Sequence, residues 1–282
     1  MDKRLIINAD DFGLCEGVNK AVAEAHTHGV LTSATIMANM PFAEDAARLG
    51  RELSGLGVGA HLNLTEGAPV SKQAEVSAIL SQSGQFAYSP AKLSFLSVVS
   101  RQVRKAIETE VRAQIRWVIE HGIKPTHLDS HKHIHSFPAI FMIVRKAAEE
   151  FGIKAIRLLF EPKEVGYPPW PATSEEGRKR AAILRTMARI NRMQDSSVFK
   201  TTACFGIAHT GKIDINFYRA LAAYNPAGSM ELMTHPGFEK GLEPAKTRLV
   251  HQRRIELESI CSEKTKQYLK DAGIRLVHYG QL

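Results

Sequence analysis

The chain has 282 residues, 44% hydrophobic and 23% charged, a balance that supports a large core and argues against gross disorder. The formal net charge is +8, but no zinc-finger, RNP-like or helix-turn-helix pattern accompanies it, so we expect a solvated basic surface and no nucleic-acid partner. Three scattered cysteines, no signal peptide and no apolar run of 18 residues predict a cytoplasmic protein without a transmembrane segment, although peripheral membrane contact is compatible with them.

Short apolar stretches alternate with segments of helical periodicity in the first part of the chain. The first stretch ends sharply at Asp10 and Asp11, and Gly29 occupies the usual place of a glycine after a last helical turn. In chain order, we expect strand 4–9, helix 16–28, strand 31–37, helix 42–53 and strand 57–64. Residues 65–100 lose the alternation, being rich in Ser, Gln, Gly and Pro, so we expect an inserted excursion there.

The alternation resumes at residue 101, where aliphatic side chains recur at helical spacing up to Gly122. A proline-rich stretch later interrupts it and carries Trp170. In chain order, we expect helix 101–121, strand 126–129, helix 137–151, strand 154–160, loop 161–173, helix 175–193, strands 203–207 and 230–233, one long helix 245–272 and strand 274–279.

Strand–helix alternation of this kind is typical of parallel strands joined by helical crossovers. Seven or eight units favour a closed barrel over an open doubly wound sheet, and no GxGxxG follows the first strand. We therefore expect an α/β fold, a distorted (β/α) barrel of seven or eight parallel strands. No repeat or linker divides the chain, so residues 1–282 are expected to form a single domain.

Polar side chains gather where the expected strands end. The carboxyl ends of parallel strands lie on one face of a barrel, which is where barrel active sites lie. Residues far apart in sequence should therefore converge there. They are Asn8, Asp10 and Asp11 after the first strand, His61 and Asn63 at the third, Asp129, His131, His133 and His135 at and beyond the fourth, and His235 after the strand that holds Glu231.

The stretch 127–135 is the most specific signal, because it holds four histidines at odd-numbered positions beside Asp129. If the chain stays extended, these side chains share one strand face. Imidazole is the commonest ligand for transition metals in proteins, and a carboxylate usually holds the outer nitrogen of such a ligand. The pattern predicts a metal site, with Asp129 in that supporting position and with His133 contacting substrate or packing.

The neighbouring carboxylates Asp10 and Asp11 can serve one site only where the strand ends and turns. One could then hold a cation while the other takes a proton, or Asp11 could simply cap the following helix. His61 is either a structural histidine or a ligand supplied by an adjoining strand. Two histidines and one carboxylate would leave positions on a metal free for water and substrate.

His235 precedes Pro236-Gly237, so it is either a packed turn residue or a general acid, since imidazole titrates near neutral pH. Arg157 is either an exposed charge or a partner that keeps Asp10 ionised. Trp170 belongs to the core or stacks on a sugar ring at the rim of the site. The expected substrate contacts are Arg157, Trp170, Asn63 and His133.

Several of these motifs together resemble the YdjC-like carbohydrate deacetylases, which include the chitooligosaccharide deacetylases. They are residues 8–13, 31–33, 57–64, 126–135 and 231–237, and they cover nearly the whole chain in the family's order. The resemblance implies a polysaccharide-deacetylase-like distorted barrel and a divalent metal, usually magnesium. It also implies the metal ligands Asp11, His61 and His131 and the base Asp10. Residues 204–207 and their spacing to His235 resemble a branch associated with hopanoid lipid synthesis.

The expected reaction is the metal-dependent removal of an acetyl group from an N-acetylated amino sugar, chitooligosaccharide-like or glycolipid-linked. Asp10 would take a proton and His235 would give one to the leaving amine. The nitrogen ligands suit zinc or another transition metal at least as well as magnesium, which prefers oxygen. The alternatives are another metal-dependent hydrolase, a phosphoesterase or cyclic amidohydrolase, and a noncatalytic sugar-binding module. The expected assembly is a homo-oligomer, a dimer.

Overall fold

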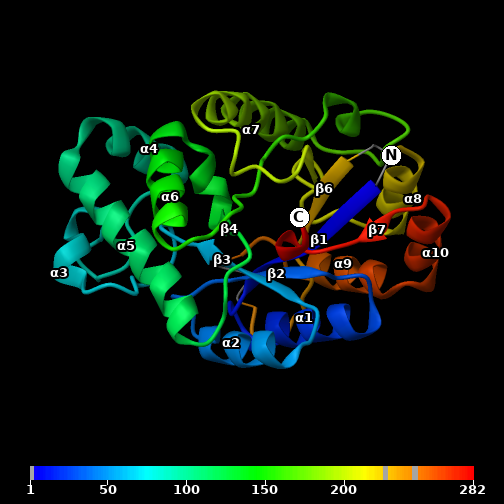
Figure 1. Cartoon of the computed structure of the whole chain (residues 1–282), viewed down its shortest axis with the longest axis horizontal. Coiled ribbons are helices and arrows are strands. Elements are labelled where there is room, and N and C mark those ends of the chain that lie inside the picture. Colours follow the sequence, from blue (N-terminus) through cyan, green and yellow to red (C-terminus); the bar gives the residue numbers. More distant parts are fainter. Residues whose placement is uncertain (1–2, 225–227, 243–246) are drawn as a thin grey trace.

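The computed structural model describes residues 3–224, 228–242 and 247–282. Its strands form one parallel sheet in the order β4-β3-β2-β1-β6-β5, with β7 beside the first half of β1. The sheet curls (Figure 1), and β4 and β5 are the outermost strands of the main path. The strands are β1 (Lys3–Phe12), β2 (Ser33–Ile36), β3 (Gly57–Leu62), β4 (Leu128–Ser130), β5 (Ala203–Phe205), β6 (Gly228–Thr234) and β7 (Arg275–Leu276).

Residues 155–160 lie between β4 and β5 in space and form hydrogen bonds on both sides. On one side, the Leu128 amide donates to the Ala155 carbonyl at 3.0 Å, and on the other the Cys204 amide donates to the Phe160 carbonyl at 2.9 Å. The expected distorted barrel of parallel strands is therefore confirmed. The strand predicted in this segment is wrong in detail, because the segment makes only one isolated bridge, to Leu128, instead of a continuous ladder.

Helices cover the outside of the curled sheet. α4, α5 and α6 lie together at one end, α7 lies above the sheet, and α8 and α10 lie at the opposite end (Figure 1). The helices are α1 (Glu16–His28), α2 (Ala43–Glu52), α3 (Gln73–Val76), α4 (Pro90–Val99), α5 (Arg101–Glu120), α6 (Pro138–Glu150), α7 (Glu175–Gln194), α8 (Ile215–Tyr224), α9 (His251–Cys261) and α10 (Glu263–Asp271).

The central strand β1 is buried from Leu5 to Phe12, as expected for a parallel strand covered on both faces. One continuous apolar cluster runs from Leu5 to Ile274 and includes the predicted inner face of α5. Within residues 65–100, α3, the short helix η1 (Ser77–Ile79) and α4 pack against α5. This stretch is therefore built as a helical cover on α5.

The predicted long helix 245–272 is two helices in the described residues, and its predicted beginning at 245 lies outside them. α9 ends at Cys261, and the backbone of the next residue, Ser262, turns to φ −67° and ψ 131°. The Ser262 side chain then accepts a hydrogen bond from the Lys264 amide at 3.3 Å, which starts α10. The last predicted strand shrinks to β7, and α8 was not predicted. In the described part of the chain, no helix has both the length and the apolar character needed to cross a membrane.

Candidate metal centre

Asp11 lies at an irregular point of β1. The pairing of β1 with β2 changes register between Ala9 and Phe12, and Asp11 has φ 64°, a left-handed conformation that Asp tolerates better than most residues. A strand irregularity of this kind redirects side chains. As a result, the neighbouring carboxylates of Asp10 and Asp11 both come within reach of His61.

Asp11, His61 and His131 bring one ligand atom each within 4.8 Å of one another. Asp11 Oδ1 lies 3.0 Å from His131 Nδ1 and 3.5 Å from His61 Nε2. Asp11 and His61 are buried, and the His131 side chain is 15% exposed. These residues fit a divalent metal because their donor atoms converge from three segments in a buried place that retains access from one side.

Asp129 orients His61. Its Oδ1 lies 2.8 Å from His61 Nδ1, while its Oδ2 accepts a hydrogen bond from Thr35 Oγ1 at 3.1 Å. A carboxylate on the outer imidazole nitrogen fixes the ring and leaves Nε2 as the ligand atom. Asp129 thus occupies the supporting position predicted from its place in the histidine-rich stretch, and Thr35 is an addition that the sequence did not reveal.

The charges of the cluster favour protonated histidine when no cation is bound. Burial opposes a charge on His61, but the Asp129 carboxylate and the hydrogen bond to Asp11 together raise its pKa to about 10. Burial raises the pKa of Asp11, but Arg253 and His131 outweigh this effect and leave that pKa well below its ordinary value. A cation bound here would take the place of protons on the imidazoles.

Arg157 is buried among three carboxylates. Its Nη1 and Nη2 donate to the two oxygens of Asp10 at 2.7 Å each, Nη1 lies 2.8 Å from Asp129 Oδ2, and Nε donates to Glu231 Oε1 at 2.8 Å. The predicted pairing with Asp10 is therefore present. The expectation that Arg157 contacts substrate is not met, since the side chain is 0% exposed and its donors are already used. It ties β1, β4 and β6 together instead.

The model of the YdjC-like protein family matches residues 4–271. The chain belongs to the YdjC-like family. It is 36% identical over 279 residues to a carbohydrate deacetylase from Brevibacillus brevis, covering 99% of both chains. It is also 30% identical over 287 residues to a chitooligosaccharide deacetylase from Serratia marcescens, covering 100% of both. Relatives named deacetylases therefore match this chain along its full length.

A solved structure of a proposed cellobiose-phosphate cleavage protein from Enterococcus faecalis has a similar fold. It superimposes with a TM-score of 0.76 at 23% identity and covers 100% of this chain and 99% of that one. The family match and the full-length relatives support an enzyme of the carbohydrate deacetylase type for this YdjC-like protein, with the buried Asp–His cluster as its candidate metal site.

In this YdjC-like protein, helix α9 supplies two contacts that sequence reasoning missed. Arg253 donates through Nη2 to Asp11 Oδ2, the oxygen that faces away from His131. One turn later, Glu256 accepts the His235 amide at 2.6 Å and the Gly211 amide at 2.9 Å. The signal was present in the sequence as two charges at the i, i+3 spacing that places them on the same helix face as Leu257 and the core.

Glu66 was also missed, although it stands at the beginning of the excursion. Its Oε1 lies 3.4 Å from His131 Nε2 and forms an ion pair with Lys132. The excursion therefore touches the candidate metal centre. The loop 161–173 reaches the same end of the sheet, because the carboxylate of Glu161 accepts the amides of residues 206–208 directly after β5.

The histidine-rich stretch does not continue as a strand. After Ser130, the chain enters the turn η2 (His131–Ser136), in which Lys132 and His133 have φ 51° and 60°. The shared strand face expected for the histidines is therefore wrong. His135 packs instead, with its ring nitrogens on Ser130 Oγ and the Arg157 carbonyl. His133 keeps a buried Nδ1 without a hydrogen-bond partner among the described residues.

Two expected substrate contacts have structural roles. The Asn63 side chain is fully buried and holds the following turn, accepting the amides of Thr65 and Glu66 at 3.1 and 3.2 Å. Trp170 is 5% exposed and packs against aromatic rings of the core, with Phe205 stacked 5.8 Å away. An exposed Trp170 at the rim is therefore a wrong expectation, because its ring has no free face for a sugar.

His235 follows β6 and is 8% exposed. Its amide is held by Glu256, but its ring atom Nδ1 has no hydrogen-bond partner in the described part of the chain. Burial lowers the pKa of His235 to about 4, although Asp10 and Asp11 act in the opposite direction. The ring is therefore neutral at pH 7 in the absence of bound groups.

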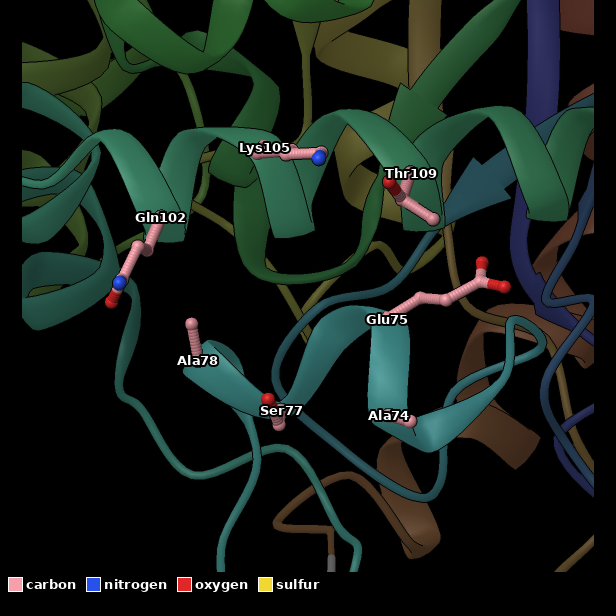
Figure 2. Close-up of a pocket in the computed structure, with 7 residues that line it drawn as sticks. All are labelled: Ala74, Glu75, Ser77, Ala78, Gln102, Lys105 and Thr109. Atoms are coloured by element: carbon pink, nitrogen blue, oxygen red, sulfur yellow. The ribbon is translucent and has the colours of Figure 1, made fainter.

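A groove of about 620 Å³ lies elsewhere, between α5 and the helices α3 and η1. Figure 2 shows Gln102, Lys105 and Thr109 on α5 along one wall, facing Glu75 and the small side chains of the excursion. None of the candidate metal ligands lines this groove. It is thus distinct from the site at the ends of the strands.

Proposed function

We propose that this protein is a metal-dependent hydrolase that removes the acetyl group from an N-acetylated amino sugar. The observation that carries the proposal is the convergence of Asp11, His61 and His131 beside the carboxylate of Asp10. The names of the full-length relatives support it. Binding of a sugar alone would not require a carboxylate beside a candidate ligand set, so we favour an enzyme over a binding module.

Asp11, His61 and His131 would hold the cation. When bound, a divalent metal polarises the acetyl carbonyl and makes water more acidic. Two imidazoles and one carboxylate form a donor set that suits zinc or another transition metal better than magnesium. We therefore propose a transition metal as the resident ion.

Asp10 would accept the proton of the attacking water. Its carboxylate is held by Arg157 on both oxygens and by Asn8 Nδ2 at 2.9 Å. These donors fix its orientation before substrate arrives.

His235 would deliver a proton to the leaving amine. Its ring is neutral in the free protein, so it would first have to take up a proton as negative charge develops beside it. The free Nδ1 and the backbone held by Glu256 place an unsatisfied imidazole at the same end of the sheet. An amine leaves a tetrahedral intermediate poorly unless it is protonated.

The test is acetate release from acetylated chitooligosaccharides, with phosphate monoesters and cyclic amides assayed in parallel. The protein is first stripped with a chelator and then reconstituted with zinc, cobalt, manganese or magnesium. Metal-dependent acetate release supports the proposal. Turnover of only the phosphate esters or cyclic amides, or acetate release that ignores chelation, contradicts it.

We expect the class of natural substrates to be narrower than the range of compounds assayed. We propose an amino sugar in a chitooligosaccharide or linked to a glycolipid, as in the hopanoid-associated branch. We also propose that the protein works in the cytoplasm and as a homodimer; its three cysteines are free, which agrees with a reducing compartment. Light scattering tests the dimer, and acetate release from free and lipid-linked sugars separates the two substrate types.

A further inference from the structure

Helix α7 presents an unusual outward face. Its inner side, including Leu184 and Ala188, packs into the protein, whereas Ile183, Ile190 and Met193 are 56%, 42% and 87% exposed. These three side chains recur at i, i+7 and i+10, so they form one stripe along the solvent side of the helix. No described segment covers this stripe, because the three residues count among the exposed large hydrophobics of the chain.

Basic side chains accompany the stripe. Between residues 177 and 194 there are six Lys or Arg residues and no Asp or Glu. Arg178, Arg185 and Arg192 recur every seven residues and form a half-buried row along one flank of the helix, whereas Lys179 and Arg189, four residues before Ile183 and Met193, lie on the exposed face with the apolar stripe. After Glu175 and Glu176 in its first turn, the charge of this helix is therefore of one sign to its end.

The arginines of that row have no carboxylate within ion-pair distance in the described part of the chain. Arg178, Arg185 and Arg192 donate instead to main-chain carbonyls, those of Thr173, Glu161 and Thr202. A carbonyl fixes the guanidinium but does not neutralise its charge. The row thus keeps its positive charge along the flank of the helix, next to its outward face.

Helix α9 gives a useful contrast. Its Ile255 is 46% exposed, about as much as Ile190 on α7. Its neighbour Arg254, however, is neutralised by Glu258 at 2.8 Å. Exposed isoleucine is thus not unique to α7; its combination with uncompensated arginines is what distinguishes this helix.

We propose that the outward face of α7 docks on an anionic lipid surface. Ile183, Ile190 and Met193 would enter the boundary of the acyl chains while the arginines contact lipid phosphates, which is the arrangement of helices that lie in a membrane interface. Tyr167, 51% exposed with its ring 5.9 Å from Arg178, extends the face at its N-terminal end. Exposed aliphatic side chains between the charges match a lipid surface better than a nucleic acid, whose backbone offers charge without hydrocarbon.

The docking helix is joined to the candidate metal centre. Asn191 Nδ2 donates to the Ser136 carbonyl at 2.8 Å, and Ser136 ends the turn that begins with His131. Docking would therefore hold the catalytic end of the sheet at a fixed distance from the lipid surface.

The experiment is vesicle flotation of the full-length protein. Vesicles of phosphatidylcholine with phosphatidylglycerol are compared with vesicles of phosphatidylcholine alone, at low and high salt. Three variants are measured: Ile183→Ser with Ile190→Ser, Arg189→Gln with Arg192→Gln, and the control Ile119→Ser with Ile255→Ser. The control isoleucines are 39% and 46% exposed and lie on α5 and α9. Circular dichroism and acetate release check that each variant is folded.

We expect binding to the anionic vesicles only, weakened by salt. The charge variant should lose about fivefold in partitioning for each cation removed, and the isoleucine variant about tenfold in all, while the control binds like the parent protein. Absence of binding by the parent protein, equal binding to neutral vesicles, or an equal loss in the control overturns the proposal. Self-association that the isoleucine variant alone abolishes also overturns it, because a second copy would then cover α7.

Discussion

The two sides of the candidate metal centre differ in how completely their polar atoms are paired. On one side, Arg157 and the carboxylates of Asp10, Asp129 and Glu231 form a closed, buried network in which no side chain is more than 3% exposed. On the other side, His133 Nδ1 and His235 Nδ1 are buried without a hydrogen-bond partner among the described residues. Buried polar atoms in proteins are nearly always paired. The closed side therefore serves as the scaffold, and the open side is where we expect water and substrate to supply the missing partners.

Removing a metal ligand should have the largest effect, because the ligands lie where the closed side and the open side meet. In His61→Ala, we expect loss of bound metal after dialysis and acetate release at background level. The graded control is Asp129→Asn, which keeps the ligand but loosens its orientation and should weaken metal binding by about 10- to 100-fold. Elemental analysis and acetate release are measured together. A His61→Ala protein that retains metal and turnover would show that the cluster is not the metal site.

Asp10 belongs to the closed network, but it is also the proposed general base. Asp10→Asn should reduce turnover by roughly 100- to 10,000-fold, the usual loss for a general base, with metal content near that of the parent protein. Near-normal turnover would mean that another group accepts the proton. Loss of metal along with activity would assign Asp10 to the metal site itself.

Breaking the closed side should show in stability. Arg157→Met leaves three buried carboxylates without their cation and should lower the free energy of unfolding by about 3–5 kcal/mol, measured by urea denaturation. The matched control is Arg145→Met. Arg145 forms an ion pair with Asp195 at 3.3 Å in which the side chains are 25% and 20% exposed, and its loss should cost less than about 1 kcal/mol. Equal losses in the two variants would contradict the difference between buried network and surface pair.

The open side is tested by the leaving group. If His235 protonates the amine, His235→Ala should lose roughly 100-fold on an acetamide substrate and far less on an acetyl ester with a good alcohol leaving group. Equal losses on both substrates would indicate a binding role. No loss on either would make His235 a packed turn residue.

The smallest effect concerns the proton that His61 carries when no metal is bound. Burial lowers the pKa of His61, but Asp129 and Asp11 raise it to about 10, so metal binding at neutral pH must release its proton. The apparent affinity should then rise at least about tenfold per pH unit between pH 6 and 8. Calorimetry in buffers of different ionisation enthalpy measures the protons released. An affinity that is flat with pH would mean that His61 is already neutral.

The sequence predicted well those features that are local. The barrel of parallel strands followed from the alternation of apolar and helical segments, and Asp129 was placed correctly because it sits beside the histidines. It did not predict the turn at Lys132 and His133, since left-handed backbone at two successive non-glycine residues has no local signature. The resulting shared face of the histidines was therefore wrong.

The remaining differences come from long-range packing. Trp170 looked like a rim residue because it lies in a proline-rich loop, but Phe205 and Phe217 from β5 and α8 enclose its ring. The role of Arg253 depends on a contact with Asp11 across 242 positions of sequence. No spacing rule anticipates either contact, because each depends on where a later helix returns to the sheet.

The segment 155–160 connects β4 to β5 with only one regular bridge, and Arg157 stands in its middle. The Arg157 side chain forms ion pairs on both sides of this segment, with Asp129 on β4 and with Glu231 on β6. It also pairs with the proposed base Asp10. The contacts between the strands and the orientation of the proposed base thus depend on the same guanidinium group, that of Arg157. In laboratory evolution of this site, we expect the charge of Asp10 to be hard to change for reasons unrelated to turnover. A variant that removes a carboxylate partner of Arg157 also weakens the contacts that hold the barrel together between β4 and β5.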